Sequence, residues 1–190
     1  MTVGPSLDEL KKRLQQVRQS AIGFLSTVYR SSTPKYANQS DLLTGEGSRR
    51  FGGRWNPVGI SAVYASLSPE TAMAETLAHN RYYGIPVEDA MPRTFVAIEV
   101  SLKEVIDLRI GTVRQRLKVS LDRMVNVDWR TVVQSGAEPL PQRIGRAASD
   151  IGLEGLIVPS AADSSGHNLL VFPPNLEGNS KIRVLNTERL

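Results

Sequence analysis

The sequence contains no cysteine, and its only histidines are His79 and His167. Without cysteine the chain cannot form disulfides, thiolate zinc sites or a cysteine nucleophile, and two histidines are too few for a multi-histidine metal centre. The P-loop signature, the G-x-G-x-x-G fingerprint and the G-x-S-x-G elbow of serine hydrolases are also missing. These absences argue against the commonest nucleotide-binding and hydrolase sites, and we expect no bound metal.

Long apolar runs are missing as well. No stretch approaches the roughly 18 consecutive apolar residues of a transmembrane helix, and the N-terminal segment is charged from Asp8 onward. The sequence therefore predicts a cytoplasmic protein without a membrane span or a targeting segment.

The cationic residues are mostly arginine. Of 23 Lys and Arg residues 17 are arginine, against 19 Asp and Glu, and the formal net charge is +4. Arginine binds phosphate through a rigid fork, so the excess suits recognition of discrete phosphates, although codon bias in a GC-rich genome explains it equally well. No run of Lys and Arg exceeds the three residues 11–13, so the charge pattern does not predict direct nucleic-acid binding.

The order of patterns predicts one domain with a mixed α+β fold, because strands and helices follow one another without strict alternation. Caps and apolar spacing predict helices over 7–22, 69–83, 112–125 and 141–151. Short apolar runs predict strands over 24–30, 60–66, 94–101, 104–108, 155–159, 168–172 and 181–186. Residues 31–59 lack periodicity and are predicted as a long irregular connection, with Trp129 in a second loop. We expect an N-terminal helix, 1–24, packed on a globular domain, 25–190.

Two features of the sequence suggest chemistry. In Gly52-Gly53-Arg54-Trp55-Asn56-Pro57 the glycines allow close approach to a ligand and Arg54 suits a phosphate or carboxylate, but the pattern also fits a turn with a buried tryptophan. Glu75 lies among alanines on the predicted helix 69–83, without cationic neighbours at helical spacing. Because a carboxylate near a core is costly, Glu75 is either functional or paired with an arginine from elsewhere.

Six segments together resemble the RES-domain family, which is named after an Arg, a Glu and a Ser. They are Tyr29-Arg30, GGRWNP, YAS, SPETAMAET, IVPSA and NLLVFP, and they span Tyr29 to Pro173. The resemblance implies a fold similar to ADP-ribosyltransferases, with split, mostly antiparallel sheets and flanking helices. It also implies a toxin of a bacterial toxin–antitoxin pair that consumes NAD by hydrolysis or phosphorolysis.

The resemblance assigns roles to seven residues. It implies that Glu75, Arg54 and Tyr64 are catalytic and that the following bind NAD: Arg30, Asn56, Ser160 and Asn168. Cleavage of the nicotinamide–ribose bond develops positive charge on the ribose, which Glu75 would stabilise, while Arg30 and Arg54 would hold the pyrophosphate. Tyr64 would stack on the nicotinamide ring, and Ser160 would hydrogen-bond the carboxamide or a ribose hydroxyl. Both have a structural alternative, a half-buried strand residue for Tyr64 and a turn cap for Ser160.

NAD is the substrate in this interpretation, so no separate cofactor is expected, and the acceptor stays open among water, phosphate and a protein side chain. The resemblance implies a cognate antitoxin with a helix-turn-helix DNA-binding segment, through which any DNA contact would come. It leaves open a homodimer or a toxin–antitoxin hetero-oligomer. Two other functions remain as alternatives: a mono-ADP-ribosyltransferase that modifies a protein, and a non-enzymatic basic binding module.

Overall fold

The strand β3 organises the sheet. The computed structural model describes residues 4–189, and its strands are β1 (Ile22–Ser32), β2 (Val63–Ser66), β3 (Thr94–Asp107), β4 (Gly155–Pro159), β5 (His167–Val171) and β6 (Lys181–Arg189). One edge of β3 pairs with β1, and the other edge is shared by β6 and, near the end of β3, by β4. Because β2 and β5 connect β1 to β4, five strands close into a ring from which β6 diverges.

The sheet confirms a mixed fold with mostly antiparallel strands and flanking helices. Every pairing except β3–β4 is antiparallel. The described strands belong to one sheet, which replaces the split sheets that we expected. The short β2 also begins at Val63 and not at Ile60.

A buried carboxylate explains why β3 is one strand, where the sequence predicted two, over 94–101 and 104–108. Glu154 is only 3% exposed, and its Oε2 accepts hydrogen bonds from the backbone N–H groups of Lys103 and Glu104. It fills the gap on the β3 edge between the last residue paired with β6 and the first paired with β4. The backbone therefore stays extended across the interruption in the apolar pattern.

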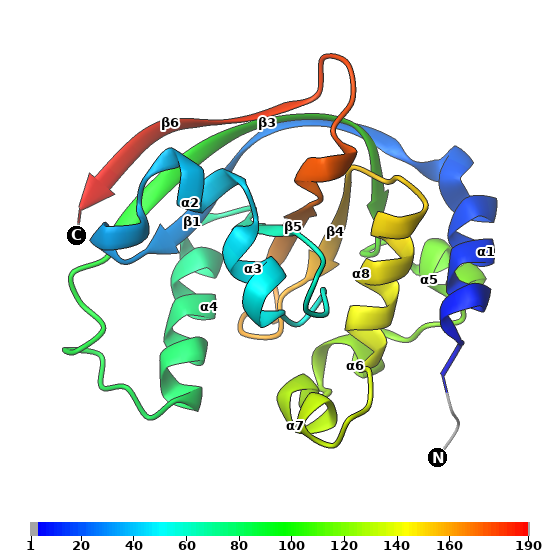
Figure 1. Ribbon diagram of the computed structural model, residues 1–190, viewed down its shortest axis with the longest axis horizontal. Coiled ribbons are helices and arrows are strands. Elements are labelled where there is room, and N and C mark those ends of the chain that lie inside the picture. The colour runs from blue at the N-terminus through cyan, green and yellow to red at the C-terminus, as the bar shows by residue number, and fades with distance from the viewer. Residues whose placement is uncertain (1–3, 190) are drawn as a thin grey trace.

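Eight α-helices flank the sheet in the described part of the chain. They are α1 (Leu7–Val17), α2 (Gln39–Leu43), α3 (Glu46–Phe51), α4 (Pro69–Tyr82), α5 (Gly111–Leu117), α6 (Leu121–Val125), α7 (Trp129–Gln134) and α8 (Leu140–Asp150). In Figure 1, β1, β3 and β6 arch over the molecule, α1, α5 and α8 lie at one end, and α4 lies at the other. Helices α6 and α7 lie on the side opposite the arch. Within the described residues, no helix is both long and apolar enough to cross a membrane.

Helix α1 begins as the sequence predicts. Ser6 and Glu9 form the expected capping box, and the helix buries one apolar stripe in the core shared with α8: Leu10, Leu14 and Val17. It ends earlier than predicted, because residues 18–20 form a 3₁₀ turn and Ile22 already begins β1, so Gly23 lies in a strand. The boundary after residue 24 stays a prediction, and residues 1–3 and 190 lie outside the described part.

The predicted irregular connection, 31–59, is wrong in part because it contains α2 and α3. The side chain of Asn38 caps α2, and Gly45, at a φ of +69°, makes the left-handed turn into α3. The predicted helix 112–125 is likewise two helices, α5 and α6, separated at Lys118, whose φ is +56°. Trp129, expected in a loop, begins α7. These helices have five to seven residues each, too few to show an apolar period.

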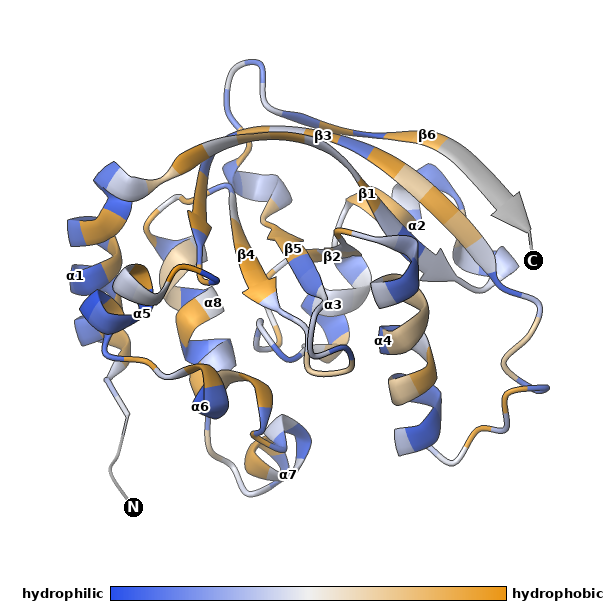
Figure 2. Cartoon of the chain, turned by 180° about the vertical axis from the view of Figure 1, so that it is seen from behind, coloured by the Kyte–Doolittle hydropathy of each residue, from blue (hydrophilic) through white to orange (hydrophobic). Residues whose placement is uncertain are grey.

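Two apolar clusters fill the molecule on opposite faces of the short strands. One lies inside the ring of strands and includes Ile98, Ile157 and Leu169. The other lies between the short strands and the helices α1, α5, α6 and α8, and includes Ile144 and Phe172. Figure 2 shows the apolar residues of β4 and β5 at the centre of the molecule and the polar residues of α1 on its outside. Since successive strand residues face opposite sides, the short strands turn their remaining side chains outward to the second cluster.

Candidate active site

Polar residues gather where the short strands end on their outer face. Alternation along β5 turns Leu169 into the ring and Asn168 to the outer face, and Ser66 occupies the same face of β2 directly opposite Asn168. Ser160 follows the last residue of β4 and is paired by its backbone N–H to Gly166. Ser66, Ser160 and Asn168 are at most 9% exposed, so each needs a hydrogen-bond partner.

For Ser160 and Asn168 that partner is Glu75 on α4. Ser160 Oγ donates to Glu75 Oε1 at 2.7 Å, and Asn168 Nδ2 donates to the same oxygen at 2.6 Å. Asn168 is itself oriented by Ser66, whose Oγ donates to Asn168 Oδ1 at 2.7 Å. The register of β2 and β5 and the position of α4 thus fix one carboxylate oxygen.

The hydroxyl of Ser160 also caps a turn. Its Oγ accepts the backbone N–H groups of Ala162 at 3.1 Å and Asp163 at 3.0 Å. These two contacts occupy its acceptor capacity and direct its proton to Glu75. The functional and the structural interpretation of Ser160 are therefore compatible.

The second carboxylate oxygen of Glu75 is free. Among the described residues, Oε2 accepts no hydrogen bond and no Lys or Arg lies within ion-pair distance of Glu75. Nor does Oε2 belong to the fully buried atoms without a partner, so it reaches solvent. Pairing with a structural arginine, the alternative left open by the sequence, does not occur in this part of the chain.

Arg54 is held by carbonyl groups at the end of α6. Its Nη1 donates to the backbone oxygens of Met124, Val125 and Val127 at 3.2–3.3 Å. Its Nε and Nη2 have no hydrogen-bond partner in the described part of the chain. Burial lowers the pKa of Arg54, and the negative charge of Glu75 acts in the opposite direction. The two residues thus lie within electrostatic reach of each other.

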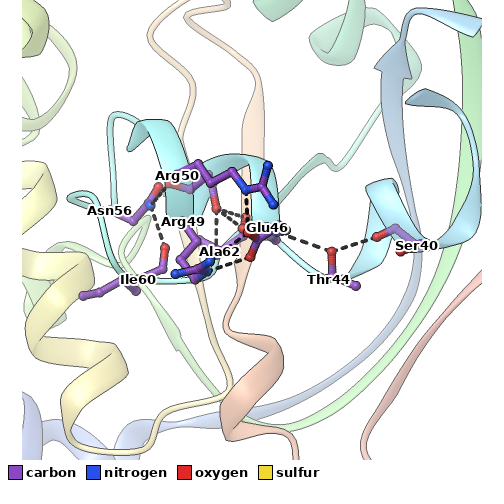
Figure 3. Close-up of polar contacts among 10 residues, drawn as sticks. Ser40, Thr44, Glu46, Arg49, Arg50, Asn56, Ile60 and Ala62 are labelled. Atoms are coloured by element: carbon purple, nitrogen blue, oxygen red, sulfur yellow. Dashed lines mark hydrogen bonds and ion pairs between the residues drawn. The ribbon is translucent and has the colours of Figure 1, made fainter. Parts of the chain in front are cut away.

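The turn over residues 53–56, which contains Arg54, is held by Tyr64 and Asn56. Tyr64 Oη accepts the backbone N–H of Trp55 at 2.9 Å and donates to Asn56 Oδ1 at 2.7 Å, and burial raises the pKa of Tyr64. Asn56 is fully buried, and its Nδ2 donates to the backbone oxygens of Ser48 and Ile60, as Figure 3 shows for Ile60. Every polar atom of the Asn56 side chain is used within the protein, so this residue supports the turn and has none left for a ligand.

The helix preceding this turn carries its own charged network. Glu46 forms ion pairs with Arg49 and Arg50 on the exposed face of α3, and Figure 3 places this cluster beside Asn56. The side-chain hydrogen bonds of the two arginines lower the pKa of Glu46 to about 2. These two arginines are paired on the surface, in contrast to Arg54.

By strand register, Arg30 lies near the hydrogen bonds that join Ser66 and Asn168 to Glu75. Its own side chain contacts α2 instead. Its neighbour Tyr29 forms the pair between β1 and β2 with Ser66. Arg30 Nη1 donates to the backbone oxygen of Leu42 at 2.8 Å, burial lowers its pKa, and Asp41 opposes that effect. The described residues show no direct contact between Arg30 and Glu75 or Arg54.

The comparison with known proteins identifies the family. The RES-domain profile matches residues 27–189. The chain belongs to the RES-domain family. The NAD(+) phosphorylase MbcT of Mycobacterium tuberculosis is 32% identical over 124 residues, which make up 64% of this chain and 62% of MbcT. The Prs ADP-ribosylating toxin of Sphingobium sp. is 33% identical over 87 residues, 46% of this chain and 52% of that toxin.

The similarity extends to a solved structure. The crystal structure of the M. tuberculosis MbcT–MbcA toxin–antitoxin complex has a TM-score of 0.78 and 26% identity, over 96% of this chain and 92% of that chain. The sequence matches to MbcT and the Prs toxin span less than two thirds of the length of those relatives.

One further basic residue, Arg130, lies against aromatic residues at the end of α4, and the sequence did not indicate it. The guanidinium carbon of Arg130, on α7, lies 4.1 Å from the ring centre of Tyr82, 4.5 Å from that of Trp129 and 5.5 Å from that of Tyr83. Tyr82 and Tyr83 form the end of α4, the helix of Glu75. The adjacent pairs Tyr82-Tyr83 and Trp129-Arg130 were the available signal, but nothing in the sequence places the two segments together.

Proposed function

We propose that this RES domain is a toxin that consumes NAD by cleaving the bond between nicotinamide and ribose. The observation that carries the proposal is Glu75, with one oxygen fixed by Ser160 and Asn168 and the other free. The guanidinium of Arg54 lies within electrostatic reach of it. The relative MbcT, an NAD(+) phosphorylase by name, supports the same chemistry.

The free oxygen of Glu75 suits the charge that develops during cleavage. When the bond between ribose C1′ and the nicotinamide nitrogen breaks, its electron pair leaves with nicotinamide and the ribose gains oxocarbenium character. A fixed carboxylate stabilises this positive charge without having to reorganise. An oxygen of phosphate or water then forms the new bond to C1′, and water also loses one proton.

Arg54 and Tyr64 have complementary parts in this proposal. The Nε and Nη2 groups of Arg54 hold the pyrophosphate by charge-assisted hydrogen bonds. The Tyr64 hydroxyl is occupied by Trp55 and Asn56, so only the ring of Tyr64 is available to stack on nicotinamide. Arg30, whose Nη1 donates to the backbone oxygen of Leu42, stays a pyrophosphate contact implied by the sequence resemblance alone. No cofactor takes part.

Release of nicotinamide tests the proposal directly. The purified protein is incubated with NAD, with and without inorganic phosphate, and nicotinamide is measured by chromatography. Glu75→Gln should lower the rate by about 100-fold or more, as expected for loss of a charge that stabilises the transition state. Glu70→Gln, at an exposed position on the same helix, is the matched control and should keep the wild-type rate. Intact NAD after long incubation with folded wild-type protein would refute the proposal.

A second candidate is transfer of ADP-ribose to a protein, and the Prs ADP-ribosylating toxin favours it. We include in this proposal the likeness of the chain to the ADP-ribosyltransferase fold. ADP-ribosyltransferases cleave the same nicotinamide–ribose bond of NAD. Label from adenine-labelled NAD would then appear on a macromolecule. Free ADP-ribose or its phosphate as the only labelled product would exclude it. The negative charge of Glu75 at the centre of the site argues against the third alternative, a non-enzymatic basic module that binds nucleic acid.

We further propose that a cognate antitoxin with a helix-turn-helix segment covers this site in the cytoplasm and makes any contact with DNA. Support comes from the similar structure, which is a toxin–antitoxin complex. Co-expression with the product of the adjacent gene should yield a complex that no longer releases nicotinamide. Separate elution of the two proteins at micromolar concentration would contradict this.

A further inference from the structure

The guanidinium of Arg130 is held by aromatic rings and by no carboxylate. Its carbon lies over Tyr82 and Trp129 at 4.1 and 4.5 Å from the ring centres, and Nε is buried without a hydrogen-bond partner. In the described part of the chain, no Asp or Glu lies within ion-pair distance of Arg130. Stacking uses the faces of a guanidinium and leaves the terminal N–H groups on Nη1 and Nη2, which lie in the plane, available. Arg130 is therefore held in position by rings and forms no ion pair in this part of the chain.

Arg130 and Arg54 belong to the same region. Arg54 donates to the carbonyl oxygen of Val127, three residues before Arg130. On the other side, Tyr82 follows Glu75 by seven residues on α4, a rise of roughly 10 Å along the helix. Figures 1 and 2 show α7 and the end of α4 near each other on the side opposite the arch of long strands.

The charges are consistent with this placement. The pKa of Arg54 depends most on burial and next on the charge of Glu75. The charge of Arg130 comes third and lowers the pKa of Arg54. Arg130 also adds to the effect of burial in lowering the pKa of His79, one helical turn after Glu75. The carboxylate of Asp128 attracts both guanidinium groups but forms an ion pair with neither. Two guanidinium groups that repel each other form a site that an anion of two negative charges would stabilise.

We propose that Arg130 is a phosphate-binding residue of this site, presented by the aromatic rings of Trp129, Tyr82 and Tyr83. This assignment rests on the proposed function and adds a second cation to Arg54. The ligand is a phosphate oxyanion, either the pyrophosphate of NAD or the inorganic phosphate that serves as acceptor. The rings hold the side chain in place before the ligand arrives, which lowers the entropic cost of binding.

Replacement of Arg130 by methionine tests the proposal and separates the two sources. Loss of a charge-assisted contact should weaken binding about 10- to 100-fold. A raised KM for NAD with an unchanged KM for phosphate supports the pyrophosphate, whereas the reverse, with a shift of product from the phosphate ester to ADP-ribose, supports the acceptor. Arg116→Met, at an exposed position on α5, is the control and should change neither constant. Wild-type values for both constants in folded Arg130→Met would overturn the proposal.

Two further variants exclude a merely structural role. Arg130→Lys keeps the charge without the fork and should restore part of the affinity lost in Arg130→Met. Tyr82→Leu keeps the guanidinium but removes a ring, and should raise the same constant by less than about tenfold. Equal effects of the lysine and methionine variants, alongside equally lowered melting temperatures, would contradict phosphate binding.

Direct binding keeps this test independent of the proposed reaction. If the wild-type protein does not cleave NAD, the proposed function fails, and calorimetric titration with NAD and with inorganic phosphate still measures the affinity. Weaker binding to Arg130→Met than to wild type would then support the assignment. Equal binding to the two proteins, or no binding to either, would overturn it.

Discussion

Replacing Gly53 by alanine tests how tightly the turn that contains Arg54, residues 53–56, is held. A Cβ at Gly53 would lie 2.5 Å from Tyr64 Oη and 2.9 Å from Asn56 Oδ1, closer than carbon and oxygen can approach without movement. Tyr64 cannot give way freely, because its ring packs on the core and its hydroxyl forms hydrogen bonds at 2.7 and 2.9 Å. The turn must therefore shift, and Arg54 with it.

The size of the effect follows from these contacts. Overpacking costs about 1–3 kcal/mol, and each disrupted hydrogen bond costs about 1 kcal/mol more, so the free energy of unfolding should fall by about 2–4 kcal/mol. For a chain of this size that corresponds to a melting temperature lower by roughly 5–15 °C. Nicotinamide release should fall as well, since the guanidinium of Arg54 would move relative to Glu75, whose charge acts on it.

The assay combines thermal unfolding with nicotinamide release under the same conditions. Gly47→Ala is the matched control, because a Cβ at Gly47, within α3, meets nothing within 4 Å. Alanine in place of this helical glycine should stabilise the protein by up to about 1 kcal/mol. If Gly53→Ala melts and reacts like the wild type, the hydrogen bonds of Tyr64 do not position Arg54 and the reasoning is wrong.

Three further substitutions test other parts of the site and its support. Ser160→Ala removes a donor to Glu75 and should lower nicotinamide release about 10- to 100-fold, measured on protein shown to be folded; a wild-type rate would contradict the role of this contact. Gly145→Ala places a Cβ 1.7 Å from the backbone oxygen of Trp55, so urea unfolding should show a loss of at least about 3 kcal/mol, and wild-type stability would refute the packing of α8. Asp163→Asn tests pH dependence. Hydrogen bonds from Thr71 and Ser165 hold the pKa of Asp163 below its ordinary 3.8. The ionised carboxylate therefore contributes to stability above that pH, and the contribution is lost as the pH falls through the lowered pKa. The difference in melting temperature between the wild type and Asp163→Asn should therefore shrink in acid, and a constant difference would contradict this.

Elements with strong local signals could be predicted from the sequence. The capping box of α1, the Ser68-Pro69 start of α4 and the buried run of β4 are all present as expected, because each depends on neighbouring residues. Helices of five or six residues, such as α2, α3 and α7, could not be predicted, since so short a helix is stabilised by packing and not by periodicity. The continuity of β3 depends on Glu154, which is distant in sequence.

The candidate site shows the same division. The resemblance to RES domains indicated Glu75, Ser160 and Asn168, and the structure brings these three into contact. It also indicated Asn56, whose role in the structure is to hold a turn, a distinction that depends on the buried partners of its amide. Arg130 could not be found, because its position is defined by rings on another helix.

The three charged residues of the proposed site have one feature in common: the hydrogen bonds and ring contacts that hold each side chain come from neutral groups. Glu75 receives hydrogen bonds from a hydroxyl and an amide, Arg54 donates to backbone carbonyls, and Arg130 lies between aromatic rings. A carboxylate–arginine pair, such as that of Glu46 on α3, would satisfy both partners within the protein but would neutralise the charges. Holding unpaired charges partly out of water costs stability, and a substrate that carries a developing cation beside phosphate groups recovers it. The choice of neutral partners is thus the strongest structural argument that these residues act on a ligand and do not merely support the fold.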